Sequence, residues 1–242
     1  MTSQLVEETL RSNNDGVAHA ASNQTNQAAG EFCKSLRIAQ HILSSSLEYT
    51  DWQATSAGGT MNMHPRNGME NGCNHHTTQT TRSVKGSASS FFVYQKALLL
   101  ESSTASAGMT NENLGRRLCT YSAATCYNLA LLYHQEGLTT GKSKFIDKAE
   151  NLYSACMRIL HDGNLSWLNP TTLLITIAAS NNLAEIEISR GMVQQASSHI
   201  HLLEWLVYEC RVVDLQLLSP EELHGLLGNL LHGKGLNTAA TA

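Results

Sequence analysis

The chain has 242 residues, of which 42 % are hydrophobic and only 15 % charged, and its formal net charge is −4. This composition can bury a sizeable core, and it argues against binding to nucleic acid or to an anionic membrane, because both need clustered Lys and Arg. Three prolines against 17 glycines favour long helices over a turn-rich β fold.

The N-terminal residues and the cysteines indicate an intracellular protein, either cytoplasmic or nuclear. Residues 1–8 contain two acids and no apolar run, which is unlike a secretory signal or a transit peptide. No apolar stretch approaches the roughly 18 residues that a membrane span needs. The six cysteines form no Cys-x-x-Cys pair, so we expect free, buried thiols and no disulfide framework.

The N-terminal part of the chain consists of one clear helix between two polar stretches. We expect residues 1–25 to be disordered, apart from a weak helical stretch near 5–10. Residues 26–52 hold a helix at about 27–48. Its apolar side chains recur at spacings of three and four: Phe32, Leu36, Ala39, Leu43 and Leu47. Residues 53–90 are predicted to be a disordered linker, because they have too few apolar side chains to offset the entropy of ordering.

Residues 91–235 are expected to form the main helical domain, followed by a disordered tail at 236–242. Its first part, 91–100, is ambiguous, because the aromatic and β-branched start suits a strand whereas the Ala-Leu end suits a helix. Helices are predicted at about 115–137, 144–161, 170–190, 193–213 and 219–231. Glycines lie at the ends of two of them, and an Asn-Pro and a Ser-Pro pair start the helices at 170–190 and 219–231. The predicted fold class is therefore all-α, built from antiparallel helical hairpins.

A short motif occurs twice in this helical domain. Asn128-Leu129-Ala130 corresponds to Asn182-Leu183-Ala184, and Gly137 corresponds to Gly191 at the predicted end of each helix. After each glycine, a second helix carries a small residue that would let the paired helices approach closely. The repeated unit is a helix, a glycine turn and a second helix.

The unit resembles the tetratricopeptide repeat, whose helices carry W-x2-L-G-x2-Y and then A-x3-F. The first copy has Cys126-x2-Leu129-Ala130-x2-Tyr133 and Ala149-x3-Tyr153. The second copy has Ser180-x2-Leu183-Ala184-x2-Glu187 and Ala196-x3-Ile200. The resemblance covers about residues 122–208 and implies that the hairpins stack as a short TPR-like α-solenoid. The alternative is an irregular helical bundle.

The resemblance also implies a binding face on the first helices of the two units. By position, this face would hold Tyr127, Asn128, Leu131, His134 and Gln135 from one unit, and Asn181, Asn182, Glu185, Ile188 and Ser189 from the other. An Asn amide can donate and accept together, so Asn128 and Asn182 could hold the backbone of an extended peptide. The alternative for both is a hydrogen bond between helices. A carboxylate clamp is not expected, since Ala124 and Ala178 replace the Lys or Arg that it needs.

No catalytic motif is present at the spacing that its chemistry requires. Residues 137–143 come nearest to a phosphate-binding loop, but their glycines are one residue too close and a helix precedes them. Metal ligands could come from His64, Cys73, His75 and His76, which lie in the predicted linker without a tight Cys-x2-Cys pair. We therefore expect no enzyme activity, no cofactor and no functional metal site.

The predicted function is a protein–protein interaction module that binds a protein or peptide segment through the face of its first helices. Residues 185–222 contain seven acids and two bases, which would suit a basic partner or form only a solvated surface. One alternative is an enzyme or metal-dependent regulator whose site has no recognisable motif. Another is a structural protein that self-associates through the leucines of the helix at 219–231.

Overall fold

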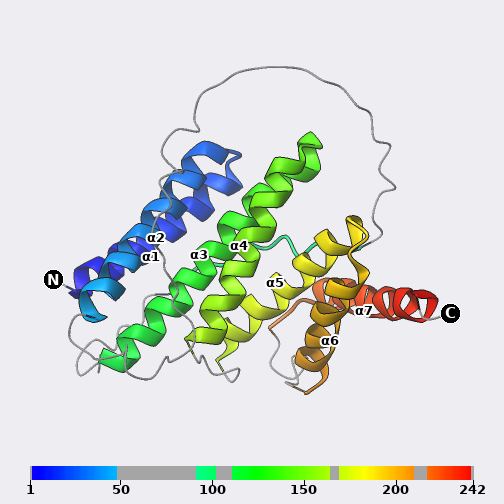
Figure 1. Cartoon of the computed structure of the whole chain (residues 1–242). Coiled ribbons are helices and arrows are strands. Elements are labelled where there is room, and N and C mark those ends of the chain that lie inside the picture. Colours follow the sequence, from blue (N-terminus) through cyan, green and yellow to red (C-terminus); the bar gives the residue numbers. More distant parts are fainter. Residues whose placement is uncertain (1, 48–90, 102–110, 164–168, 210–216, 241–242) are drawn as a thin grey trace.

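The computed structural model describes residues 2–47, 91–101, 111–163, 169–209 and 217–240 (Figure 1). The described residues form seven α-helices: α1 (Thr2–Ala21), α2 (Thr25–Leu47), α3 (Asn111–Thr140), α4 (Ser143–Asp162), α5 (Pro170–Ser189), α6 (Val193–Glu209) and α7 (Pro220–Ala240). They contain no β-strand, which confirms the predicted all-α class. None of these helices is both long and apolar enough to cross a membrane.

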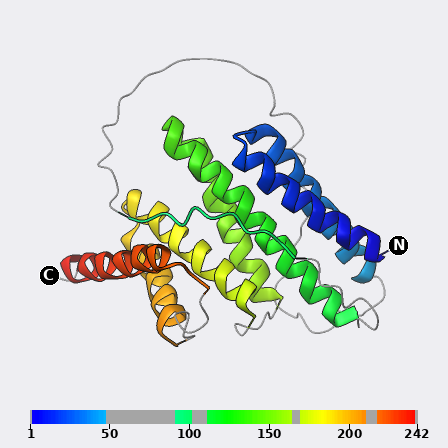
Figure 2. The same ribbon diagram turned by 180° about the vertical axis from the view of Figure 1, so that it is seen from behind.

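Consecutive helices pack as hairpins that lie beside one another. The closest neighbours are α1 with α2, α3 with α4, and α5 with α6, and each hairpin contacts the next through α2 with α3, α4 with α5, and α6 with α7. The first helices also touch, α1 with α3 and α3 with α5. As a result, the odd-numbered helices gather on one side of the molecule (Figure 2).

Each of the three hairpins turns through a residue with positive φ, a conformation that Gly and Asn adopt most readily. These residues are Asn23 (φ 56°), Gly141 (φ 67°) and Gly191 (φ 74°). Gly191 ends its helix as expected, but Gly137 does not, because α3 runs on for three residues to Thr140. Gly137 is instead a contact position, where a Cβ atom would overlap the Ile146 side chain of α4.

The N-terminal residues that we expected to be disordered form helix α1, which packs against α2 and α3. Its buried positions are mostly small or polar, such as Thr9, Ser12 and Asn13, so the apolar periodicity that marks a helix is weak. The contact with α2 is close, because a Cβ atom on Gly16 would lie 2.6 Å from Phe32 Cε1. Side-chain size and hydrogen bonding hold this helix in place.

The other predicted helices occur close to their expected bounds, except that α3 and α7 extend beyond them. Asn169 caps α5 by accepting hydrogen bonds from Thr171 and Thr172, as its position before a proline predicts. Ser219 and Glu222 form a reciprocal capping box at the start of α7. Helix α7 continues to Ala240, through most of the expected disordered tail. The predicted linker, 53–90, lies outside the described residues.

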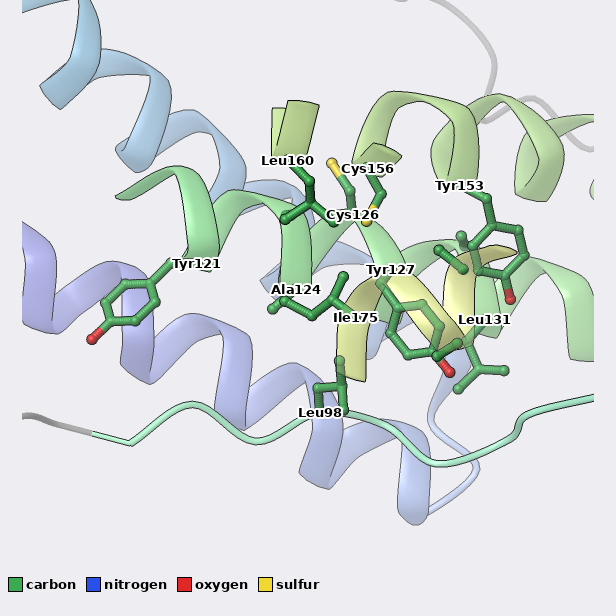
Figure 3. Packing of buried hydrophobic residues seen from close by; sticks show 14 of the residues in the cluster. Leu98, Tyr121, Ala124, Cys126, Tyr127, Leu131, Tyr153, Cys156, Leu160 and Ile175 are labelled. Atoms are coloured by element: carbon green, nitrogen blue, oxygen red, sulfur yellow. The ribbon is translucent and has the colours of Figure 1, made fainter. Parts of the chain in front are cut away.

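The core lies mainly around α3 and α5, whose residues are buried on nearly all sides in the middle of each helix. Three fully buried tyrosines lie at its centre: Tyr94, Tyr127 and Tyr153. The ring centroids of Tyr127 and Tyr153 are 5.8 Å apart (Figure 3). Cys126 and Cys156 are buried free thiols in the same region, whereas Cys33 and Cys119 are free and half-buried. Cys73 and Cys210 lie outside the described residues, so the expectation of free thiols is confirmed for four of the six cysteines.

The buried thiol of Cys126 predicts a loss of stability at alkaline pH. Burial, and to a smaller extent the nearby Cys33, raises the pKa of Cys126 to about 12. An unfolded thiol ionises near pH 8.5, so between these two pH values the unfolded state binds fewer protons and unfolding becomes easier as pH rises. We expect Cys126 to contribute up to about 1.4 kcal/mol per pH unit to this loss. Urea unfolding of wild type and Cys126→Ala at several pH values above 9 should show a shallower decline in the variant, and parallel declines would contradict the assignment.

Candidate peptide-binding face

Residues 91–101, here called the inserted segment, run in an extended form over the odd-numbered helices (Figure 2). Neither of the two structures that the sequence allowed for this stretch, strand or helix, is formed. Its buried side chains are Phe91, Tyr94, Leu98 and Leu100. Gln95 and Lys96 are exposed, and Leu99 is 65 % exposed. The inserted segment therefore belongs to the core on one side and to the surface on the other.

One asparagine from each odd-numbered helix binds the backbone of the inserted segment. These four residues, the asparagine ladder, are Asn14 of α1, Asn128 of α3, Asn182 of α5 and Asn229 of α7. Each side chain accepts a hydrogen bond from the N–H of one segment residue and donates one to the C=O of the same residue. The pairs are Asn229 with Phe92, Asn182 with Tyr94, Asn128 with Leu98, and Asn14 with Leu100.

The ladder replaces the neighbouring strand that an extended backbone would have in a sheet. All eight hydrogen bonds are 2.7 to 3.0 Å long, within the ordinary range for N–H···O bonds. The four bound residues all have even numbers, because alternate residues of an extended chain direct their N–H and C=O to the same side. The ladder thus recognises an extended backbone and makes no contact that depends on side-chain identity.

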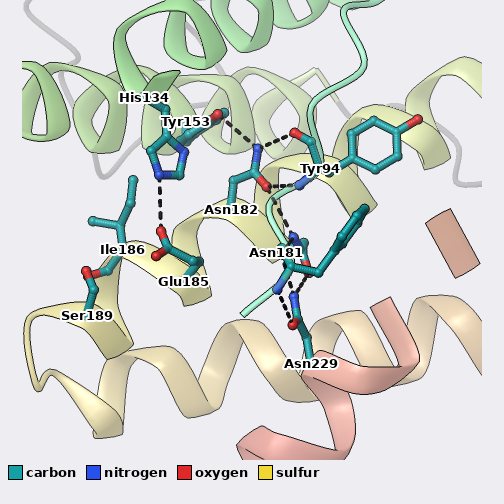
Figure 4. Close-up of polar contacts among 10 residues, drawn as sticks. Tyr94, His134, Tyr153, Asn181, Asn182, Glu185, Ile186, Ser189 and Asn229 are labelled. Carbon is teal, nitrogen blue, oxygen red and sulfur yellow. Dashed lines mark hydrogen bonds and ion pairs between the residues drawn. The ribbon is translucent and has the colours of Figure 1, made fainter. Parts of the chain in front are cut away.

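A second asparagine reinforces the ladder at two points. The residue before the ladder Asn in α1, Asn13, donates to the carbonyl of Leu98, and the corresponding residue in α5, Asn181, donates to the carbonyl of Phe92. Ladder amides in turn donate to the side-chain oxygens of Asn13 and Asn181, at 3.0 and 2.6 Å. These links join α1 to α3 and α5 to α7, and they fix the direction in which the amides of Asn128 and Asn229 point. Figure 4 shows the link between Asn181 and Asn229.

Lys96 is the one even-numbered segment residue between Phe92 and Leu100 that no ladder asparagine binds, and it lies near the hydroxyl of Tyr127 in α3. This hydroxyl lies 3.2 Å from the carbonyl oxygen of Tyr94 and 3.3 Å from that of Lys96, and it can donate to either. Tyr127 precedes Asn128 as Asn13 precedes Asn14, so the same position of each first helix contacts the segment.

Of the ten residues that the sequence placed on a binding face, Gln135 and Ile188 are half-buried and Ser189 is exposed. The other seven are buried: Tyr127, Asn128, Leu131, His134, Asn181, Asn182 and Glu185. Four make hydrogen bonds to the inserted segment or its ladder, Leu131 packs in the core, and His134 and Glu185 bind each other. The alternative of inter-helix hydrogen bonds also holds in part, since Asn128 bonds Asn13 as well as the segment. We use "inner face" for the surface of α1, α3, α5 and α7 that contacts the inserted segment.

His134 and Glu185 join the two central hairpins beside the inner face (Figure 4). His134 Nε2 lies 3.1 Å from Glu185 Oε2, and both side chains are almost fully buried. The His134 ring meets Tyr153 edge-on, with 6.0 Å between centroids, and the Tyr153 hydroxyl accepts a hydrogen bond from Asn182. His134 Nδ1 has no hydrogen-bond partner in the described structure. The pair thus connects α3 to α5 and to the ladder.

Two of the seven acids counted towards an acidic surface are in fact buried. Glu185 is paired with His134, and Glu187 lies 3.4 Å from His199 Nε2 of α6. The acidic character expected for a partner surface on α5 is correspondingly reduced. The described residues also contain no group of three or more His, Cys, Asp and Glu side chains placed to hold a metal ion. The His64, Cys73, His75 and His76 cluster lies outside them.

The hydroxyl of Tyr94 gives a direct test of what the inner face requires. It is buried and makes no hydrogen bond of ordinary geometry in the described structure, and burial, with the charge of the nearby Glu222 carboxylate, raises the pKa of Tyr94. Tyr94→Phe should therefore leave the melting temperature unchanged or raise it, because removing an unpaired buried hydroxyl costs nothing. Tyr127→Phe, the matched control, loses a bonded hydroxyl and should lower the stability by about 1 kcal/mol. Equal losses in thermal unfolding experiments would contradict this assignment.

The two outer ladder residues, Asn14 and Asn229, were not predicted, although the sequence carries a signal for Asn14. The pair Asn13-Asn14 has the same spacing to the turn residue Asn23 as Asn181-Asn182 has to Gly191. After that turn, Ala28-x3-Phe32 repeats the spacing of Ala196-x3-Ile200. Helices α1 and α2 therefore carry a further copy of the motif, in which Asn replaces Gly at the turn.

Comparison with known proteins adds no assignment. No family model, curated protein or solved structure matches this chain.

Proposed function

We propose that this protein is a non-enzymatic, tetratricopeptide-like interaction module that binds an extended segment of a partner protein along its inner face. The observation that carries the proposal is the asparagine ladder. Four side chains on four separate helices bind both backbone groups of a segment that has no regular structure of its own. That arrangement is a recognition device for a peptide backbone.

The ladder is compatible with exchange of the segment. An extended backbone that is buried on helices needs a hydrogen-bond partner for each N–H and C=O group, and the ladder amides supply both. The same amides accept any extended backbone, because every non-proline residue offers one N–H and one C=O. The inserted segment is then the occupant in the isolated chain, and another segment can take its place.

The arrangement of the hairpins supports the tetratricopeptide-like part of the proposal. Ladder residues occur at equivalent positions of α1, α3 and α5. The second helix of each hairpin carries an alanine at the position where the repeat has its small residue: Ala28, Ala149 and Ala196. All three alanines are buried. Repeated units of this kind bury a continuous core by stacking and present one extended face, and about three are needed for stability.

A cut protein tests the proposal directly. Recognition sites for a specific protease are introduced within 82–88 and 103–108 of the full-length chain, the folded protein is cut at both, and the released segment is removed. We expect the emptied module, checked for helix content by circular dichroism, to select binding sequences from a displayed library of random peptides. Asn128→Ala/Asn182→Ala should lose that binding, whereas the exposed control Asn26→Ala/Asn151→Ala should keep it.

Two results would contradict the proposal. An emptied module that remains helical but selects no peptide is not a binding module. An emptied module that loses its helices shows that the inserted segment is an integral part of the fold.

A further inference from the structure

We infer that the inserted segment is both the template for the partner's segment and its competitor. The partner presents an extended segment that runs from α7 towards α1, with apolar side chains at the positions of Phe91, Tyr94, Leu98 and Leu100. It binds when the inserted segment leaves the inner face. This inference rests on the proposed function and specifies the ligand and its control.

The direction of the ligand follows from the double donors on the inner face. The carbonyl of Phe92 accepts from Asn229 and Asn181, and the carbonyl of Leu98 accepts from Asn128 and Asn13. A segment that ran the opposite way would place N–H groups where these paired donors point. Turning the amides over is prevented by the hydrogen bonds that ladder side chains make to Asn13 and Asn181.

The side-chain pattern follows from which segment residues are buried. Tyr94 is fully buried against the ring of Tyr127, with 6.5 Å between centroids, and Phe91 meets His232 edge-on at 5.1 Å. Leu98 and Leu100 enter the main core cluster. The unpaired hydroxyl of Tyr94 adds no polar requirement, so Phe suits that position equally well.

Several other positions are free, and one is limited by a close contact. Gln95, Lys96 and Leu99 are exposed, so their side chains do not select the ligand. Phe92 packs on Gly225 of α7, where a Cβ atom would overlap the Phe92 ring. The ligand is therefore an apolar, extended segment with a large residue at each of the four buried positions and a flat one beside Gly225.

The inserted segment competes with a partner because it already lies on the inner face and belongs to the same chain. The inserted segment satisfies all four ladder residues, so a partner has no ladder amide to bind until it is displaced. A segment in the same chain acts at an effective concentration that reaches the millimolar range for short flexible connections. Binding to the intact protein is weakened by the fraction of molecules in which the inner face is occupied. Cutting the chain on both sides of the segment removes this advantage.

The test uses the protein with two cleavage sites, before and after cutting, and a fluorescent synthetic peptide of residues 91–101. Fluorescence anisotropy should show at least about tenfold tighter binding to the cut and emptied protein than to the uncut protein. N-methylation at Tyr94 and Leu98 removes donors to Asn182 and Asn128 and should abolish binding. N-methylation at Gln95 and Leu99, which make no hydrogen bond in the described structure, is the matched control and should bind like the parent peptide.

Each part of the inference can fail separately. Equal binding of the two N-methylated peptides overturns the ladder register, and equal binding of the reversed sequence overturns the direction. Equal affinity of cut and uncut protein overturns the competition. A concentration-dependent dimer of the uncut protein in gel filtration shows that a second copy, and not a partner protein, supplies the segment.

The library selection separates this inference from the proposed function. Selected peptides that align with large apolar residues at positions 1, 4, 8 and 10, counted from Phe91, support both. Selected peptides without this pattern overturn the ligand assignment and leave the binding module standing. If the peptide of residues 91–101 rebinds but no library peptide is selected, the proposed function fails, because the inner face then serves this chain alone.

Discussion

Asn182→Ala should lower the free energy of unfolding by about 3 to 5 kcal/mol. The Asn182 side chain accepts from the N–H of Tyr94 and from Asn181, and it donates to the carbonyl of Tyr94 and to the hydroxyl of Tyr153. All these groups are buried, so truncation leaves the N–H of Tyr94 and the hydroxyl of Tyr153 without these partners where water does not reach, and the carbonyl of Tyr94 keeps only the hydroxyl of Tyr127. Each unsatisfied buried group costs about 1 to 3 kcal/mol, and the losses are partly shared. Urea unfolding followed by circular dichroism measures the change.

Asn14→Ala is the matched control at the other end of the ladder. Asn14 makes the same two backbone hydrogen bonds, to Leu100, but it is half-buried, so water can replace the lost amide. We expect a loss of about 1 kcal/mol or less. Hydrogen exchange at the amides of Tyr94 and Leu100 adds a local readout, because each variant should release its own part of the inserted segment. Equal, small losses for both variants would show that the ladder does not hold the segment.

The helices of the second half could be predicted because their start and stop signals are local. Asn169 and Ser219 cap helices through bonds to residues two or three positions away, and Gly191 makes a turn that only a few residue types allow. Gly137 shows the limit of this reasoning. The same residue type in the same motif serves close packing against Ile146, and the turn moves to Gly141.

Helix α1 could not be predicted from apolar periodicity, because its buried face does not depend on large apolar residues. Ser35 of α2 donates to the carbonyl of Thr9 and lies 3.3 Å from the hydroxyl of Thr125 in α3. Such contacts depend on where three helices meet, which is information about tertiary structure. A sequence with few charges and many Ser, Thr and Asn residues can therefore hold helices that a hydrophobic pattern does not reveal.

The sequence predicts which face of the helices carries the candidate site, but it does not predict that residues 91–101 lie on that face. Asn128 and Asn182 share a place in the repeated motif, so the motif puts them on one face. The inserted segment is extended only because distant side chains bind it: Asn229 is 137 residues from Phe92, and Asn14 is 86 residues from Leu100. No local pattern in residues 91–101 specifies those contacts, which explains why strand and helix were equally plausible there.

The polar groups beside the inner face form a connected system, so the ladder does not act alone. Asn182 bonds the hydroxyl of Tyr153, the Tyr153 ring packs on His134, and His134 bonds Glu185. Burial raises the pKa of Tyr153 and keeps its hydroxyl neutral at physiological pH. The hydroxyl can therefore accept from Asn182. The His134–Glu185 pair sets the distance between α3 and α5, and with it the spacing of two ladder residues.

Glu185→Ala should lower the free energy of unfolding by about 3 to 5 kcal/mol, because it leaves a buried His134 with neither ring nitrogen bonded. Glu185→Gln keeps an acceptor for Nε2 and should cost less. The double variant His134→Leu/Glu185→Leu removes both polar groups and should be more stable than Glu185→Ala, since an apolar pair of similar volume replaces a buried ionisable pair at little cost. Urea unfolding of these variants and of His134→Leu and Glu185→Leu alone completes a double-mutant cycle. A double variant whose loss equals the sum of the single losses would show that the two side chains do not act as a pair, and α3 and α5 would then be held together by their apolar contacts.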